Sequence, residues 1–157
     1  MELSGERMIA ASRADVWAAL NDPEILQASI PGCTEMTGNA VDGYEATVTQ
    51  KIGPVKATFH GVVALTDIVE ATSYRISGEG KGGAAGYASG GADVTLSDVE
   101  GGTLLQYDVQ AKVGGKIASL GGRLIGGVAK KLADRFFKNF EEAIVGPTEE
   151  GAQDAAE

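Results

Sequence analysis

The chain has 157 residues, of which 43% are hydrophobic, and this length suits one domain with its own buried core. A formal charge of −9 argues against a nucleic-acid-binding protein, because no basic excess is available to neutralise phosphates. The single cysteine, Cys33, excludes an internal disulfide. No export signal is visible at the N-terminus and no apolar run reaches the roughly 20 residues of a membrane span, so a cytoplasmic protein is expected.

The first thirty residues predict one strand followed by two short helices. The strand is expected over residues 2–10. Ser12 then occupies an N-cap position, with Asp15 three residues later, close to a capping box. Asp22 followed by Pro23 repeats the pattern, because aspartate is a good N-cap and proline is favoured at the first helical position.

A long alternation of apolar and polar side chains follows and predicts an antiparallel sheet. A strand near Cys33 and those between residues 44 and 113 make about seven in all, and no helical pattern separates them. Hairpin turns are marked at Asp42-Gly43, Gly53-Pro54 and Glu100-Gly101-Gly102. The inward positions are nearly all apolar, with Gln50 the main polar exception, and this composition favours a receptacle over a reactive site.

The last apolar segment, Lys116 to Val145, predicts one amphipathic helix about 45 Å long. Such a helix must bury its apolar stripe against something wide, and the bent sheet is the expected receiver, with the functional site between the two. The stripe repeats at steps of three or four residues and consists of Ile117, Leu120, Leu124, Val128, Leu132, Phe136, Phe140 and Ile144.

Charge is uneven along this C-terminal part of the chain. The helix segment carries six basic residues against Asp134, Glu141 and Glu142. This excess is consistent with an ordinary solvated face, or with contact to an acidic partner or to anionic lipid. Residues 1–145 are expected to form the single domain, and residues 146–157, with four acidic residues and no basic one, an acidic, disordered tail.

Glycines cluster at two places. The pairs Gly114-Gly115, Gly121-Gly122 and Gly126-Gly127 fall near the start of the helix, where each interior glycine costs about 1 kcal/mol relative to alanine. They either leave room for a ligand or allow the helix to lie close to the sheet, and both interpretations stay open. Residues 78–83 match the letters GxGxxG, but no helix follows, so a bulged connection at the rim is expected instead of a dinucleotide site.

Few residues could support catalysis or metal binding. Cys33 and His60 are the one pair suited to nucleophilic chemistry, and His60 falls on the outward side of its strand, so the two are not expected to meet. One histidine, one cysteine and scattered carboxylates supply no metal-ligand set.

The predicted order of strand, two helices, strands and long helix resembles the α+β helix-grip fold of the START/Bet v 1-like (SRPBCC) superfamily. Within it, Asn21-Asp22-Pro23, Ile30-Pro31-Gly32-Cys33 and the run from Gly121 to Ile125 leading to Phe136-Phe137 resemble the CoxG family, named for the G subunit of carbon monoxide dehydrogenase. The resemblance covers about residues 1–145. Some members carry a longer C-terminal extension with a membrane-spanning end, and the short acidic tail here departs from that pattern.

The resemblance implies a non-catalytic accessory protein without an intrinsic cofactor, which serves a CO dehydrogenase or related molybdenum hydroxylase. It would link that enzyme to the inner face of the cytoplasmic membrane by binding a quinone-like lipophile. Two alternatives remain: a polyketide-cyclase- or dehydratase-like enzyme on the same fold, and an adaptor with a filled core. The residues expected to line the cavity are Trp17, Tyr44, Val48, Phe59, Tyr74, Tyr87, Tyr107, Leu124, Val128, Leu132 and Phe136.

Overall fold

The computed structural model describes residues 1–146, and its framework is a seven-stranded antiparallel sheet of order β1-β7-β6-β5-β4-β3-β2. Every neighbouring pair is antiparallel, as the absence of helical crossovers predicts. The strands are β1 (Glu2–Ile9), β2 (Cys33–Asn39), β3 (Gly43–Ile52), β4 (Val55–Val69), β5 (Ser73–Lys81), β6 (Tyr87–Val99) and β7 (Gly102–Gly114).

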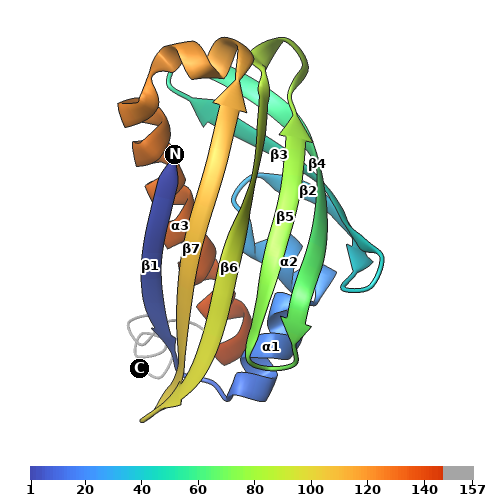
Figure 1. The fold of residues 1–157 in the computed structure, drawn as a ribbon, viewed down its shortest axis with the longest axis vertical. Helices are drawn as coiled ribbons and strands as arrows, with labels where there is room; N and C mark the ends of the chain where they lie inside the picture. The colour runs from blue at the N-terminus through green and yellow to red at the C-terminus, as the bar shows by residue number, and fades with distance from the viewer. Residues whose placement is uncertain (147–157) are drawn as a thin grey trace, which may run out of the picture.

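Three helices lie on one face of the curved sheet (Figure 1). Helices α1 (Arg13–Leu20) and α2 (Pro23–Ser29) sit at one end, and α3 (Gly122–Val145) runs across the concave face. The first strand closes one edge of the sheet beside the last strand, β7, and α2 packs against β2 and α3 at the opposite edge. The predicted helix-grip architecture is confirmed.

Both predicted helix caps are present. The Ser12 hydroxyl accepts a hydrogen bond from the Asp15 amide at 3.2 Å, and the Asp22 carboxylate accepts one from the Glu24 amide at 2.9 Å. Each bond satisfies an amide that has no partner within its own helix. These two local signals fix where α1 and α2 begin.

The C-terminal helix is shorter than its sequence pattern predicts. Lys116 and the four residues after it belong to a 3₁₀ turn, η2 (Gly115–Leu120), and α3 begins only at Gly122. Gly121 separates them with φ of 94°, in the left-handed region that only glycine adopts readily. The α-helix is therefore about 36 Å long, instead of about 45 Å.

Buried apolar side chains form two separate clusters. The larger one joins α1, the second half of α3 and the middle of the sheet, and it includes Ile9, Leu105 and Phe140. The smaller one lies at the other end of the sheet and joins Val55, Ala85 and Ile117. The candidate cavity lies between the sheet and α3, beside the larger cluster.

The glycine-rich segment of residues 78–91 is mostly strand. Gly78 and Gly80 belong to β5, and only residues 82–86, with the 3₁₀ turn η1 (Gly83–Ala85), connect it to β6. The predicted connection at the rim is therefore shorter than expected. Gly82 is required because a Cβ atom there would lie 2.6 Å from the Phe59 ring.

Candidate ligand cavity

A partly open cavity of about 290 Å³ lies between the concave face of the sheet and the middle of α3. Alternating strand residues supply its floor and helical residues supply its roof, because side chains two apart on a strand share one face. Its walls are formed by Leu20, Leu26, Ile30, Met36, Tyr44, Val63, Leu65, Tyr74, Ile76, Ala92, Val94, Leu105, Tyr107, Val109, Ala133, Phe136 and Phe137.

Tyrosine hydroxyls are the only polar side-chain groups that the described residues place on these walls. The Tyr44 hydroxyl donates a hydrogen bond of 2.7 Å to the Asn21 carbonyl, so it is already engaged. Burial raises the pKa of both Tyr44 and Tyr74, which keeps these phenols neutral. Within residues 1–146, no carboxylate, imidazole or cationic side chain lines the cavity, so it offers an apolar surface with neutral donors at two or three points.

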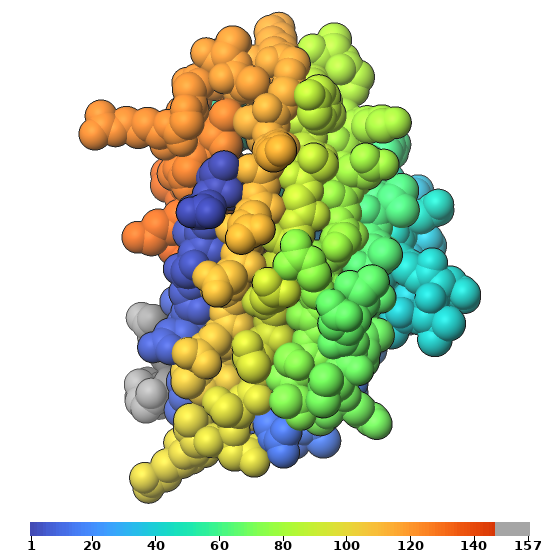
Figure 2. Space-filling model, in the orientation of Figure 1, coloured from blue at the N-terminus to red at the C-terminus, as the bar shows by residue number. Residues whose placement is uncertain are grey.

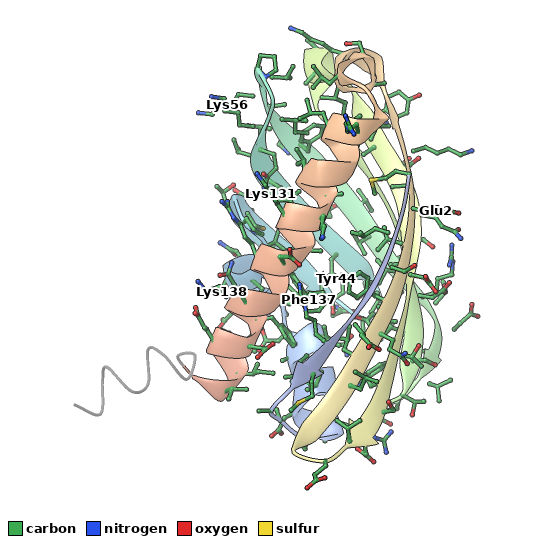
Figure 3. The ribbon with its side chains drawn as sticks, turned by 90° about the vertical axis from the view of Figure 1, so that its left-hand side faces the viewer. Glu2, Tyr44, Lys56, Lys131, Phe137 and Lys138 are labelled. Atoms are coloured by element: carbon green, nitrogen blue, oxygen red, sulfur yellow. The ribbon has the colours of Figure 1, made fainter. Side chains whose placement is uncertain are left out.

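Four of the eleven residues predicted to line the cavity do so: Tyr44, Tyr74, Tyr107 and Phe136. Trp17 lies one side chain behind the wall, edge-on to the Tyr74 ring at 5.2 Å between centroids. Whether any of these residues contacts a ligand stays a prediction. Figure 3 shows Tyr44 and Phe137 facing the space between the sheet and the helix.

The other predicted residues lie elsewhere. Phe59 packs against the smaller cluster, and Tyr87, at 53% exposure, points to solvent. Leu124 and Val128 line a separate surface groove, and Val48 and Leu132 are half-buried outside the cavity. The interpretation of the helix stripe was wrong in register, because the roof is formed by Ala133, Phe136 and Phe137.

Sequence reasoning missed several wall residues. Phe137 is buried and stacks on Tyr107 at 5.3 Å, but it follows Phe136 directly and a stripe of single positions selects only one of the two. Leu26, Ile30 and Met36 come from α2 and β2, whose relation to the sheet is a tertiary feature. The adjacent pair of phenylalanines was the available signal for Phe137.

Arg7 is an inward-facing polar residue that the strand pattern did not reveal. It lies on the concave side of β1, forms an ion pair with Asp134 of α3 and places its guanidinium 5.7 Å from the centre of the Phe137 ring. Neither Arg7 nor Gln50 lines the cavity, since the Gln50 amide donates to the Pro31 carbonyl. Arg7 thus joins the edge strand to α3 without placing a charge in the cavity.

Glu141, in the second half of α3, gives a pH-dependent prediction. Burial raises its pKa, and the nearby Arg7 offsets part of this effect. A raised carboxyl pKa means that folding favours the protonated form, so stability falls as the pH rises from the ordinary pKa through the raised one. We expect Glu141→Gln to remove this fall and to be at least as stable as the parent at neutral pH.

Urea unfolding across the acidic to neutral range measures this effect. Glu142→Gln, which removes the same charge from the next residue, is the matched control. A parent stability that does not fall relative to Glu141→Gln as the pH rises would contradict the assignment.

The glycine pairs separate into two groups. A Cβ atom at Gly114 or Gly115 would clash with Tyr87 or with the backbone of Gly86, so close approach explains this pair. A Cβ atom at Gly122, Gly126 or Gly127 would meet nothing within 4 Å. Close contact between helix and sheet therefore does not explain these three glycines, and the alternative, that they leave space or loosen the helix, is favoured.

This difference predicts opposite effects of alanine. Gly126→Ala should raise the free energy of unfolding by about 0.5–1 kcal/mol, because the helix gains propensity and no atom is displaced. Gly114→Ala should destabilise the protein, because Tyr87 must move. Urea unfolding of both variants checks this, and a destabilised Gly126→Ala would show that the space at this helix position is not free.

The structure shows no activated nucleophile at the two residues considered for catalysis. Burial raises the pKa of Cys33, which disfavours the thiolate, and its thiol donates to the Glu35 carbonyl. His60 is exposed on the outer face, 3.3 Å from the Thr47 hydroxyl. Within residues 1–146, no group of three or more His, Cys, Asp or Glu side chains could hold a metal ion.

A bent antiparallel sheet that grips a long C-terminal helix over an apolar cavity defines a START/Bet v 1-like protein. Solved structures of this fold include a START superfamily protein from Mycobacterium smegmatis (16% identity, 91% of this chain and 96% of that chain, TM-score 0.67). They also include Ara h 8.0201 (20% identity, 92% and 97%, TM-score 0.61). The chain belongs to the CoxG family, the G subunit of carbon monoxide dehydrogenase, whose pattern matches residues 5–145.

A conserved protein from Geobacillus kaustophilus is similar in sequence as well as in fold. It is 32% identical, and the alignment covers 92% of this chain and 95% of that chain with a TM-score of 0.85. No curated protein matches the chain. Among residues 1–146, none of the helices is both long enough and apolar enough to cross a membrane.

Proposed function

We propose that this protein binds a lipophilic small molecule in the cavity under α3 and acts as a non-catalytic accessory protein. The observation that carries this proposal is a cavity of about 290 Å³ with apolar walls, on which the described residues place three tyrosines as the only polar side chains. An apolar cavity of about 150 Å³ in another protein holds benzene, so this one has room for a substituted ring with a short tail. The raised pKa values of Tyr44 and Tyr74 favour neutral hydrogen-bond donors, which suit a carbonyl-bearing ligand.

A quinone-like electron acceptor has this chemistry, with an apolar ring and two carbonyl oxygens. Membership of the CoxG family supports a partnership with a CO dehydrogenase or related molybdenum hydroxylase. In this role the protein would carry the acceptor between that enzyme and the inner face of the cytoplasmic membrane, and would hold no cofactor of its own.

Native mass spectrometry with solvent extraction tests the proposal on protein purified from a quinone-producing host. We expect an isoprenoid quinone or similar lipophile at close to one per chain. An empty protein that also fails to bind added quinones would overturn the carrier function and favour the adaptor, whose direct test is binding to the dehydrogenase.

The single tryptophan provides a second measurement in solution. Trp17 contacts Tyr74, which lines the cavity, so a quinone bound there would lie close enough to quench the indole fluorescence. Titration with a short-chain quinone should give saturable quenching with one site per chain. A linear response without saturation would indicate collisional quenching alone and would count against a bound ligand.

A further inference from the structure

Three separate parts of the chain meet at the end of the molecule opposite α1 and α2. They contact one another through the cluster of Val55, Ala85 and Ile117, and Leu124 lies against the turn at Gly53. This end is at the top of Figures 1 and 2, where the orange η2 segment meets the yellow-green β5–β6 connection. We call it the hairpin end and define it as residues 49–58, 79–90 and 110–131.

The hairpin end concentrates positive charge in a protein that is acidic as a whole. It contains eight of the thirteen lysine and arginine residues and one, Glu79, of the twenty-two acidic residues. The charge is invisible as a run in the sequence, because four separate turns or segment ends contribute to it. The eight basic residues are Lys51, Lys56, Lys81, Lys112, Lys116, Arg123, Lys130 and Lys131.

These cations are not neutralised within the described part of the chain. The three ion pairs among residues 1–146 use Arg7, Arg13 and Arg75, all outside the hairpin end. Lys51 and Lys56 are direct cross-strand partners in the β3–β4 register, an arrangement in which like charges repel. An anionic surface brought to this end would relieve that repulsion.

The residue types favour a lipid surface over a protein surface. Seven of the eight cations are lysines, whereas four of the five cations elsewhere are arginines. Protein interfaces are enriched in arginine and depleted in lysine. Lysine is a flexible point charge that suits diffuse phosphate headgroups, and its apolar stem can lie in the interfacial layer.

Apolar side chains lie exposed among these cations. Tyr87 is 53% exposed and Leu124 is 38% exposed. Leu124 also lines a surface groove of about 450 Å³, whose rim carries Arg123 and Lys131. Tyrosine and leucine surrounded by lysines are typical of a surface that enters the headgroup layer of a bilayer.

We propose that the hairpin end docks on a bilayer that contains anionic phospholipids. The docking surface rests on the proposed function only in placing the protein at a membrane, and vesicle binding can be measured without any quinone. Figure 3 shows Lys56 and Lys131 projecting from the same side of the molecule, with Lys138 further along α3.

Sedimentation with vesicles tests the proposal through two matched double variants of one helix. Arg123→Gln with Lys131→Gln neutralises the hairpin end, and Arg135→Gln with Lys138→Gln removes the same residue types from the second half of α3, where both are exposed. The midpoints of the two pairs are about 14 Å apart along the helix, beyond the Debye length of about 8 Å at physiological salt. The vesicles contain phosphatidylcholine alone or equal parts of phosphatidylcholine and phosphatidylglycerol.

The full chain should bind the phosphatidylglycerol vesicles, and binding should weaken as salt is raised. One cation near the surface changes affinity about fivefold, so Arg123→Gln with Lys131→Gln should weaken binding roughly 25-fold, and the control pair less than about twofold. Equal losses in both pairs, or binding to neither vesicle, would overturn the proposal. Absence of vesicle binding together with charge-dependent binding to the purified dehydrogenase would reassign the hairpin end to an acidic protein, while saturable quinone binding would leave the proposed function intact.

Discussion

Replacing Phe140 with alanine is expected to lower the free energy of unfolding by about 3–5 kcal/mol, the usual cost of removing a buried aromatic ring. The Phe140 side chain is completely buried and stacks with Phe136 at 5.7 Å. It belongs to the larger core cluster, where it contributes to holding α3 on the sheet. Urea unfolding followed by circular dichroism measures the loss.

The matched control for this prediction is Val145→Ala, at the end of the same helix. Val145 is 46% exposed, so its truncation should change stability by about 0.5 kcal/mol or less. Similar losses in the two variants would contradict the view that α3 is held mainly by its buried second half. A loss confined to Phe140→Ala would show that this half anchors the roof of the cavity.

Replacing Ala133 with leucine is expected to weaken ligand binding at least tenfold. Ala133 is the smallest roof residue on α3, and a leucine side chain there would extend into the space that we assign to the ligand. The added carbons enter an existing cavity, so they should leave stability unchanged or raise it, by up to about 0.8 kcal/mol per buried CH₂ group. Quenching of Trp17 fluorescence and urea unfolding measure the two effects separately.

Ala143→Leu makes the same substitution at an exposed position of the same helix. This control should leave quinone affinity unchanged. A full-affinity Ala133→Leu variant would place the ligand elsewhere, and a destabilised one would show that the wall at Ala133 cannot accept the added carbons. Either result would require a new assignment of the roof.

Local patterns in the sequence were sufficient for the elements and their order. Apolar alternation identified the strands because side chains on a strand alternate between faces, and Ser12 and Asp22 marked the helix starts because their side chains cap free amides. These signals depend on neighbours a few residues away. The same reasoning explains why Tyr44, Tyr74 and Tyr107 were correctly placed on the cavity wall: each lies on the inward side of its strand.

Three features were decided only by the tertiary structure, because each depends on residues far apart in the chain. Helix α3 starts after Gly121 and faces the cavity with Ala133 and Phe137, a register set by its contacts with the sheet and α2. Arg7 meets Asp134 only because the first strand lies beside the last helix. The hairpin end gathers its lysines from turns separated by up to eighty residues, so its positive charge exists only in the folded protein.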